Sequence, residues 1–167
     1  MRVYLDTGGF MALFSEEGWK IMEKAVGEFS DKIIFCISPF VLEEFFFKIM
    51  YERKEKELIK RLLGIDEDDP SKRIDTFFRK YGSNFAQFLS MFESVGVEKD
   101  IIFLFANKEI LKKLTKDVKT YDILHFLTAL SNTMDGFLTT DKKFIKWLSK
   151  NKDLFKNEVY NHLNFLL

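Results

Sequence analysis

The sequence predicts a single α/β domain built around a parallel β-sheet. Short apolar runs rich in β-branched residues alternate along the chain with segments whose apolar residues recur every three or four positions. That alternation of strands and helices is typical of an α/β domain with a parallel sheet. The chain has 167 residues, of which 47% are hydrophobic, which suits one core and one domain over 1–167.

Composition excludes several other classes of protein. Only two prolines and eight glycines occur, so disordered and linker-rich chains are excluded. No apolar stretch approaches the roughly 20 residues that cross a bilayer, and the first residues lack the apolar region of a signal peptide. We therefore expect a soluble cytoplasmic protein with no membrane contact. The single cysteine, Cys36, lies in an apolar run and is predicted to be a buried hydrophobic residue.

The first half of the chain is predicted to contain two strand–helix units. A short strand over 2–5 is stopped by an acid and two glycines, and an amphipathic helix is expected over 18–29. A second strand is expected over 32–37. Ser38 and Pro39 then resemble an N-cap and a first helical turn, so a helix should run from there to about Tyr51, or as far as 63.

The second half is predicted to continue in the same style. One or two helices rich in phenylalanine are expected between 71 and 97. The elements expected after them are a strand over 100–105, a helix over 107–115, a helix over 120–133, a strand over 136–139, a helix over 142–150 and an edge strand over 159–165.

Charge is balanced over the whole chain but not along it. The chain has 26 basic and 26 acidic residues, yet between positions 105 and 156 eleven lysines face six acids, a net charge of about +5. A solvated helical surface is the plain explanation, and contacts with phosphate groups are the other. The acidic run 66–69 lacks the glycine and the late glutamate of a calcium loop, so an exposed loop is expected there.

Several chemistries are absent from the sequence. It has no phosphate-binding glycine loop, no serine nucleophile elbow, no His-Glu-x-x-His and no Cys-x-x-Cys. Only His125 and His162 occur. The position of His125 one turn after Asp122 favours a partly buried, hydrogen-bonded histidine over a general base. Any active groups should therefore be carboxylates.

Three aspartates stand where a parallel sheet gathers its ligands. Asp6 and Asp141 each follow a predicted strand, and the carboxyl ends of parallel strands meet at one edge of the sheet. Asp122 stands in the first turn of a strongly apolar helix. Taken singly, each aspartate is also explained as an ordinary helix cap.

Glu44 is less easily explained because its helix is apolar on nearly all sides. An i, i+4 pair with Lys48 is the simple alternative, but such a pair stabilises a helix by only a few tenths of a kcal/mol. If carboxylates from separate elements converge, a hard cation such as Mg²⁺ or Mn²⁺ is the usual means of neutralising them. An arrangement of this kind is suited to phosphodiester hydrolysis.

Three stretches of the sequence resemble the PIN-domain ribonucleases, a family that includes the VapC toxins. The stretch 3–7 resembles the opening strand with the family's first acid, and 37–44 resembles the second motif. We assign the glutamate of that motif to Glu44 rather than to Glu43 by its spacing from Ser38. The third stretch, 121–130 followed by 135–144, is similar to the aspartate-led helix, the last core strand and the Thr-x-Asp segment.

The resemblance implies a three-layer α/β/α sandwich with a central parallel sheet and a helical insertion over about 52–100. It implies an acidic pocket of Asp6, Glu44, Asp122 and Asp141, with Thr139 as a supporting hydroxyl. The pocket would hold Mg²⁺ or Mn²⁺ and cleave RNA endonucleolytically, with the lysine-rich second half binding the RNA backbone. A homodimer and a silencing antitoxin protein are further implications.

Other functions stay open at this point. Gly8 stands where the family frequently has Asn or Ser beside the first acid, so metal affinity is in question. A PIN-fold protein that has lost catalysis and binds RNA or protein is therefore the alternative. A phosphatase with an aspartyl nucleophile is disfavoured, because its second acid would have to stand at position 8.

Overall fold

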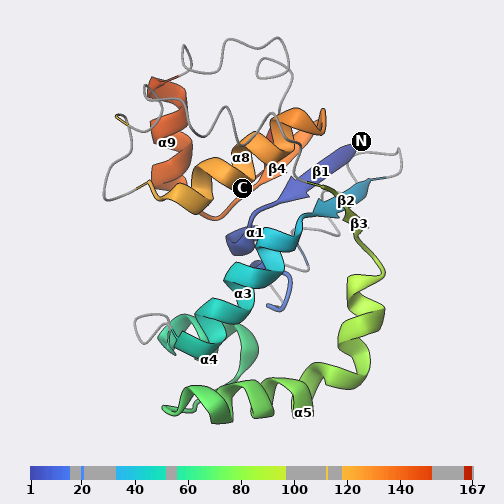
Figure 1. Ribbon diagram of the computed structural model, residues 1–167, viewed down its shortest axis with the longest axis vertical. Coiled ribbons are helices and arrows are strands. Elements are labelled where there is room, and N and C mark those ends of the chain that lie inside the picture. Colours follow the sequence, from blue (N-terminus) through green and yellow to red (C-terminus); the bar gives the residue numbers. More distant parts are fainter. Residues whose placement is uncertain are drawn as a thin grey trace.

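A computed structural model describes residues 1–15, 33–51, 56–96, 118–151 and 164–166, together with positions 20 and 112. At its centre is an all-parallel, five-stranded sheet, which confirms the predicted fold class (Figure 1). Its strands are β1 (Arg2–Leu5), β2 (Ile34–Ile37), β3 (Glu93–Ser94), β4 (Gly136–Leu138) and β5 (Asn164–Leu166).

The direction in which the chain adds strands to the sheet reverses beside β1. The order is β3-β2-β1-β4-β5, so the chain fills one side of β1 first and the other side later. Tyr4 pairs with Cys36 on β2 and with Phe137 on β4. In an open parallel sheet such a reversal leaves a crevice at the carboxyl ends of the two strands that flank it. Here those strands are β1 and β4.

Two aromatic clusters attach helices to the two faces of the sheet. The helices are α1 (Thr7–Ala12), α3 (Pro39–Tyr51), α4 (Lys56–Leu63), α5 (Pro70–Leu89), α8 (Thr120–Ser131) and α9 (Lys142–Lys150). One cluster joins α1, α3 and α5 through Phe10, Phe45 and Phe88. The other joins α8, β4 and α9 through Phe126, Phe137 and Phe144. Figure 1 shows α8 and α9 on one side of the strands and α3 on the other, which gives three layers.

Helix α1 approaches the sheet more closely than a side chain permits. A Cβ atom on Gly9 would lie 2.6 Å from the carbonyl oxygen of Leu138 on β4. The turn after β1 is held from the other direction as well, because the amide of Asp6 donates to the same carbonyl oxygen at 3.1 Å. Glycine at position 9 therefore lets the residues that follow β1 lie against the end of β4.

The segment between α3 and β3 is largely helical, in agreement with the helices expected there. The buried guanidinium of Arg73 on α5 donates to the carbonyl oxygens of Glu67 and Ile49, and so attaches the acidic loop and α3 to α5. In the same loop Asp66 and Asp68 form ion pairs with Lys60 and Lys56 of α4. That this segment is an insertion into a smaller domain stays a prediction.

Several boundaries differ from those expected. Helical structure was expected up to 97, but α5 ends at Leu89 and the chain enters β3. This strand has no apolar pattern of its own, and it forms because the edge of β2 offers partners, including Ile37 O for the amide of Val95 at 2.9 Å. Helix α3 ends at Tyr51, as expected, and α4 begins at Lys56. A continuation of α3 to 63 would pass through 52–55, which lie outside the described residues. The segments 18–29, 100–105 and 107–115 lie outside the described residues, apart from positions 20 and 112.

The remaining elements follow the sequence closely. Helix α9 has the bounds expected for it. Of the strand expected over 159–165, positions 159–163 lie outside the described residues, and β5 is observed at Asn164–Leu166. Cys36 is fully buried, as predicted. Across the described ranges, no helix combines the length and apolar character needed to cross a membrane.

Candidate active site

Asp6 is the acid at the centre of the sheet edge. It follows β1 directly and caps α1, with its Oδ1 accepting from the Gly9 amide at 2.7 Å. Burial raises the pKa of this carboxyl above its usual value. The Gly9 amide, the charge of His125, the hydroxyl of Thr139 and the charge of Lys48 act in the opposite direction. Asp6 therefore has the expected position, and its alternative role as a helix cap is also observed.

Thr139 and Asp141 lie beside it, at the end of β4. Thr139 is fully buried, and its Oγ1 accepts from the Asp141 amide at 3.0 Å. The Asp141 Oδ1 accepts from the amides of Lys143 and Phe144, at 2.8 and 2.9 Å, and so caps α9. Since Thr139 also bonds to Asp6, this threonine connects two of the predicted acids, which is the supporting position expected for it.

Glu44 approaches the same edge from α3. Its Oε2 accepts from the Thr7 hydroxyl at 2.5 Å and lies 3.1 Å from His125 Nε2, while Oε1 lies 3.2 Å from Lys48 Nζ. Burial raises the pKa of Glu44, but the hydrogen bonds and charges of these three neighbours outweigh it and lower the pKa to about 2. Glu44 is therefore a fully ionised carboxylate, whereas Glu43 is exposed.

His125 belongs to a buried hydrogen-bond chain. Its Nδ1 lies 2.9 Å from the Tyr4 hydroxyl, which lies 2.7 Å from the Ser38 hydroxyl. With a neutral imidazole, Tyr4 donates to Nδ1 and Nε2–H donates to Glu44. The predicted hydrogen-bonded histidine is thus confirmed, and it is fully rather than partly buried. The roles of Tyr4, Ser38 and Thr7 were missed, because a polar group in a strand or turn has no sequence signal for a partner elsewhere in the chain.

Asp122 completes the set from the first turn of α8. Its Oδ2 accepts from the Lys119 amide at 2.5 Å, so the cap expected of it is present. Burial raises its pKa, the Lys119 amide opposes this, and the negative charges of Asp141, Glu44 and Asp6 raise it further, to about 6. All three other predicted acids thus act on Asp122. The other three carboxylates therefore lie near enough to Asp122 for their charges to raise its pKa.

The oxygen atoms of the four acids and Thr139 are of the type that a hard cation prefers, although the described side chains are not spaced to coordinate one ion. Carboxylate and hydroxyl oxygens are the ligands that Mg²⁺ and Mn²⁺ prefer, and the raised pKa of Asp122 marks negative charge that a cation would neutralise. Among the described residues, however, no three His, Cys, Asp or Glu side chains are close enough together to hold one ion. Internal donors, including Lys48 at Glu44, now hold these oxygens.

Gly8 borders the Asp6 carboxylate. A Cβ atom at this position would lie 3.3 Å from Asp6 Oδ1 and 2.5 Å from the hydroxyl oxygen of Thr140. Thr140 is exposed, so a turn of its side chain would make room. A Ser or Asn at position 8 would therefore place a polar side chain next to the Asp6 carboxylate, whereas Gly8 has no side chain to do so.

Fold and site together define a PIN-like α/β domain with an acidic edge at the carboxyl ends of β1 and β4. No protein-family model matches the sequence, and no curated protein matches it either. Among solved structures, the chain is similar to VapBC-1 from nontypeable Haemophilus influenzae, at 14% identity and a TM-score of 0.58, covering 99% of this chain and 96% of that one.

A second similar structure is VapBC2 from Rickettsia felis, bound to a DNA fragment from its promoter. The identity is 14%, the TM-score 0.50, and the match covers 87% of this chain and 92% of that chain. Because VapC toxins are PIN-domain proteins, both structures confirm the PIN-like fold expected from the sequence.

Proposed function

We propose that this protein is an Mg²⁺- or Mn²⁺-dependent endoribonuclease. The proposal rests on the positions of four acids at the carboxyl edge of a PIN-like sheet, where the buried Thr139 hydroxyl bonds to both Asp6 and Asp141 and where burial and the charges of the other three acids raise the pKa of Asp122 to about 6. A parallel sheet uses this edge for its ligands. Glu44 also pairs with Lys48, but the charges that act on Asp122 are those of three other acids, which is typical of a functional site rather than of a structural ion pair.

The side chains divide the work of such a site between them. Asp6, Glu44, Asp122 and Asp141 would hold the metal, and Mg²⁺ or Mn²⁺ bound there would polarise the phosphate and supply hydroxide from water. Thr7 and His125 hold Oε2 of Glu44. A metal ion would therefore bind Oε1, where it would replace the ammonium group of Lys48. Thr139 keeps Asp6 and Asp141 in register through its buried hydroxyl.

We extend the proposal to the biological setting of a toxin. Its support is the fold shared with the two VapBC structures. The protein would be silenced by a VapB-like antitoxin and would act as a homodimer. Co-expression with a candidate antitoxin, followed by copurification and a growth assay, tests this setting separately from the chemistry.

Cleavage of mixed RNA by the purified protein tests the activity. We expect cleavage with Mn²⁺ or Mg²⁺, none with EDTA, and loss of cleavage in Asp6→Asn and Asp122→Asn variants that remain folded by circular dichroism. Asp75→Asn is the matched control, because Asp75 is exposed on α5. Equal activity of wild type and both site variants would refute the proposal.

A binding module without catalysis is the second candidate, and one observation favours it. Both oxygens of Glu44 already have partners, and the described residues contain no group of three side chains spaced to hold a metal ion. Calorimetry with Mn²⁺ separates the two candidates. Binding that Asp6→Asn weakens supports the nuclease, and absence of binding supports the module.

A further inference from the structure

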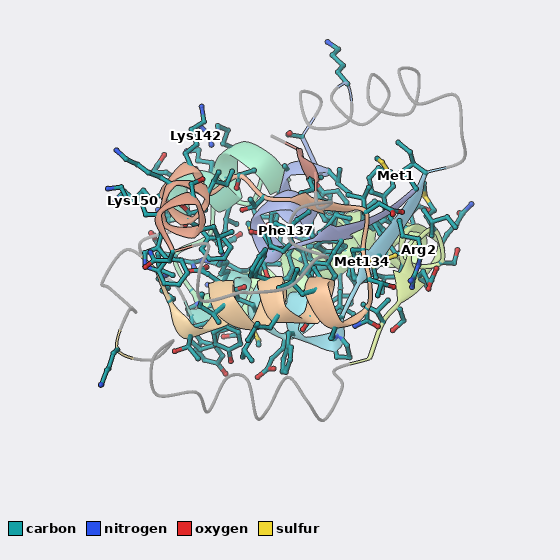
Figure 2. The ribbon with its side chains drawn as sticks, turned by 90° about the horizontal axis from the view of Figure 1, so that it is seen from above. Met1, Arg2, Met134, Phe137, Lys142 and Lys150 are labelled. Carbon is teal, nitrogen blue, oxygen red and sulfur yellow. The ribbon has the colours of Figure 1, made fainter. Side chains whose placement is uncertain are left out.

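Helix α9 carries a row of exposed lysines that begins beside the acidic edge. Lys142, Lys146 and Lys150 are all exposed, and successive members are four residues apart. Side chains four apart lie on the same face of a helix, so the row is about 12 Å long. Figure 2 shows Lys142 and Lys150 pointing away from the body of the fold.

Within the part of the chain that the structure describes, the lysines of this row lack the acid partners that lysines of α4 have. On α4, Lys56 and Lys60 are paired with Asp68 and Asp66. Helix α9 contains no acid, and within the described ranges none of the three row lysines forms an ion pair. Surface helices are usually stabilised by alternating charges, which this face does not have. Its positive charge is therefore available to an external anion.

An exposed aromatic ring lies at the same end of the fold. Asp141, which caps α9, and Asp122, in the first turn of α8, act on each other electrostatically, so the starts of these helices are neighbours. Tyr121 precedes Asp122 and is 37% exposed. The exposed third of this residue lies next to carboxylates and a lysine row. Its ring can stack on a flat ligand.

We propose that this surface binds single-stranded RNA, with the lysine row on the phosphate backbone and Tyr121 stacked on a base. A row of cations together with an aromatic platform is the combination by which proteins bind single strands. Stacking needs an unpaired base, which favours a single strand over a duplex. The inference rests on the proposed function, since it states how that site would hold its substrate.

The lysine row predicts a specific salt dependence. Binding of a fluorescein-labelled 12-nucleotide RNA is measured by anisotropy in EDTA, between 50 and 300 mM salt. Each phosphate contact to a single strand contributes about 0.7 to the slope of log affinity against log salt. The combined variant Lys142→Gln, Lys146→Gln, Lys150→Gln should therefore lower the slope by about 2. The corresponding Lys→Arg variant should retain the slope.

A charge-matched control lies at the other end of the molecule. Arg61→Gln, Lys72→Gln and Arg79→Gln together remove three exposed cations from α4 and α5. This variant should keep the slope of the wild type. A slope that falls equally in both triple variants, or in neither, would overturn the role of the row.

Tyr121 predicts a loss of affinity without a change of slope. Tyr121→Ala should weaken binding about tenfold at every salt concentration, and Tyr121→Phe should not. An abasic strand of the same length should bind wild type and Tyr121→Ala equally. A Tyr121→Ala variant that loses no affinity for normal RNA, or loses as much for the abasic strand, would overturn the stacking contact.

The binding assay fails separately from the cleavage assay, because EDTA removes the metal. RNA binding with the predicted slopes but no cleavage under any metal would refute the nuclease and support this surface. Metal-dependent cleavage, together with equal slopes for wild type and the triple Lys→Gln variant, would support the nuclease and overturn the role of the lysine row. A preference for duplex DNA over the single strand would also overturn the proposal.

Discussion

His125 Nε2 lies 3.1 Å from Glu44 Oε2, a contact that joins α8 to α3 across 81 positions of sequence. An ionised carboxylate in a mostly buried place is costly unless donors surround it. His125 and Thr7 supply donors to one oxygen, and Lys48 supplies the cation beside the other. This contact therefore holds a charged side chain in one orientation at the edge of the sheet.

Removing the Tyr4 hydroxyl from the hydrogen-bond chain that leads to Glu44 tests that support. Tyr4→Phe keeps the buried ring, which stacks on Phe137, but removes the group bonded to His125 and Ser38. We expect the free energy of unfolding to fall by about 1–2 kcal/mol, because two buried polar atoms lose a partner. Urea denaturation measures it. Tyr51→Phe, at a residue 62% exposed, should leave stability unchanged.

The low pKa of Glu44 predicts loss of stability in acid. Its pKa falls from 4.5 to about 2 in the folded protein, so the unfolded chain binds the proton first. The stabilisation is complete above pH 4.5 and disappears as the pH falls through about 2. We expect wild type to lose about 3 kcal/mol more than Glu44→Gln across this window. Parallel acid titrations of the two proteins that coincide would contradict the assignment.

The raised pKa of Asp122 predicts the opposite pH dependence of stability. Its pKa rises from 3.8 to about 6, so the folded protein holds a proton longer and stability decreases as the pH rises through that window. At pH 7 the ionised group destabilises the fold, and Asp122→Asn should increase the free energy of unfolding by about 3 kcal/mol. The gain should vanish at pH 3. Denaturant curves at both values measure this, and an equal gain at both would count against it.

Lys48 should compete with a divalent cation. Its Nζ lies 3.2 Å from Glu44 Oε1, and its charge also lowers the pKa of Asp6. Removing this ammonium leaves negative charge for Mn²⁺ to neutralise, so Lys48→Gln should bind Mn²⁺ about tenfold more tightly. Calorimetry measures the affinity, and Lys72→Gln, at an exposed residue of α5, is the control. Unchanged or weaker Mn²⁺ binding in Lys48→Gln would show that Lys48 does not occupy the cation's place.

Two glycines should respond oppositely to alanine. At Gly9 the new Cβ would lie 2.6 Å from the Leu138 carbonyl oxygen, so Gly9→Ala should destabilise the fold by at least about 2 kcal/mol. At Gly82, inside α5, the nearest atom would be a Phe78 ring carbon at 3.5 Å. Gly82→Ala should therefore stabilise the protein by about 0.5–1 kcal/mol. Thermal melts of both variants provide the comparison.

Local pattern was enough to predict much of the fold. Helix α9 was expected with its observed bounds, because Asp141 caps it and its apolar residues recur with helical period. Strand β1 was recognised by an apolar run that ends at an acid and two glycines, although the tight turn expected there is the start of α1, which Asp6 caps. By contrast, β3 has the sequence Glu93-Ser94, which carries no strand signal, and exists only because β2 offers hydrogen-bonding partners at its edge.

The sequence by itself determined which residue types this protein places at the ends of its strands and helices, since caps, turns and periodicity depend on neighbours in the chain. Only the tertiary structure decided that Glu44 receives His125, Thr7 and Lys48, and that Asp122 shares its surroundings with three other acids. These relationships depend on distances between elements far apart in sequence, which are set by the order of the strands and the packing of helices on them.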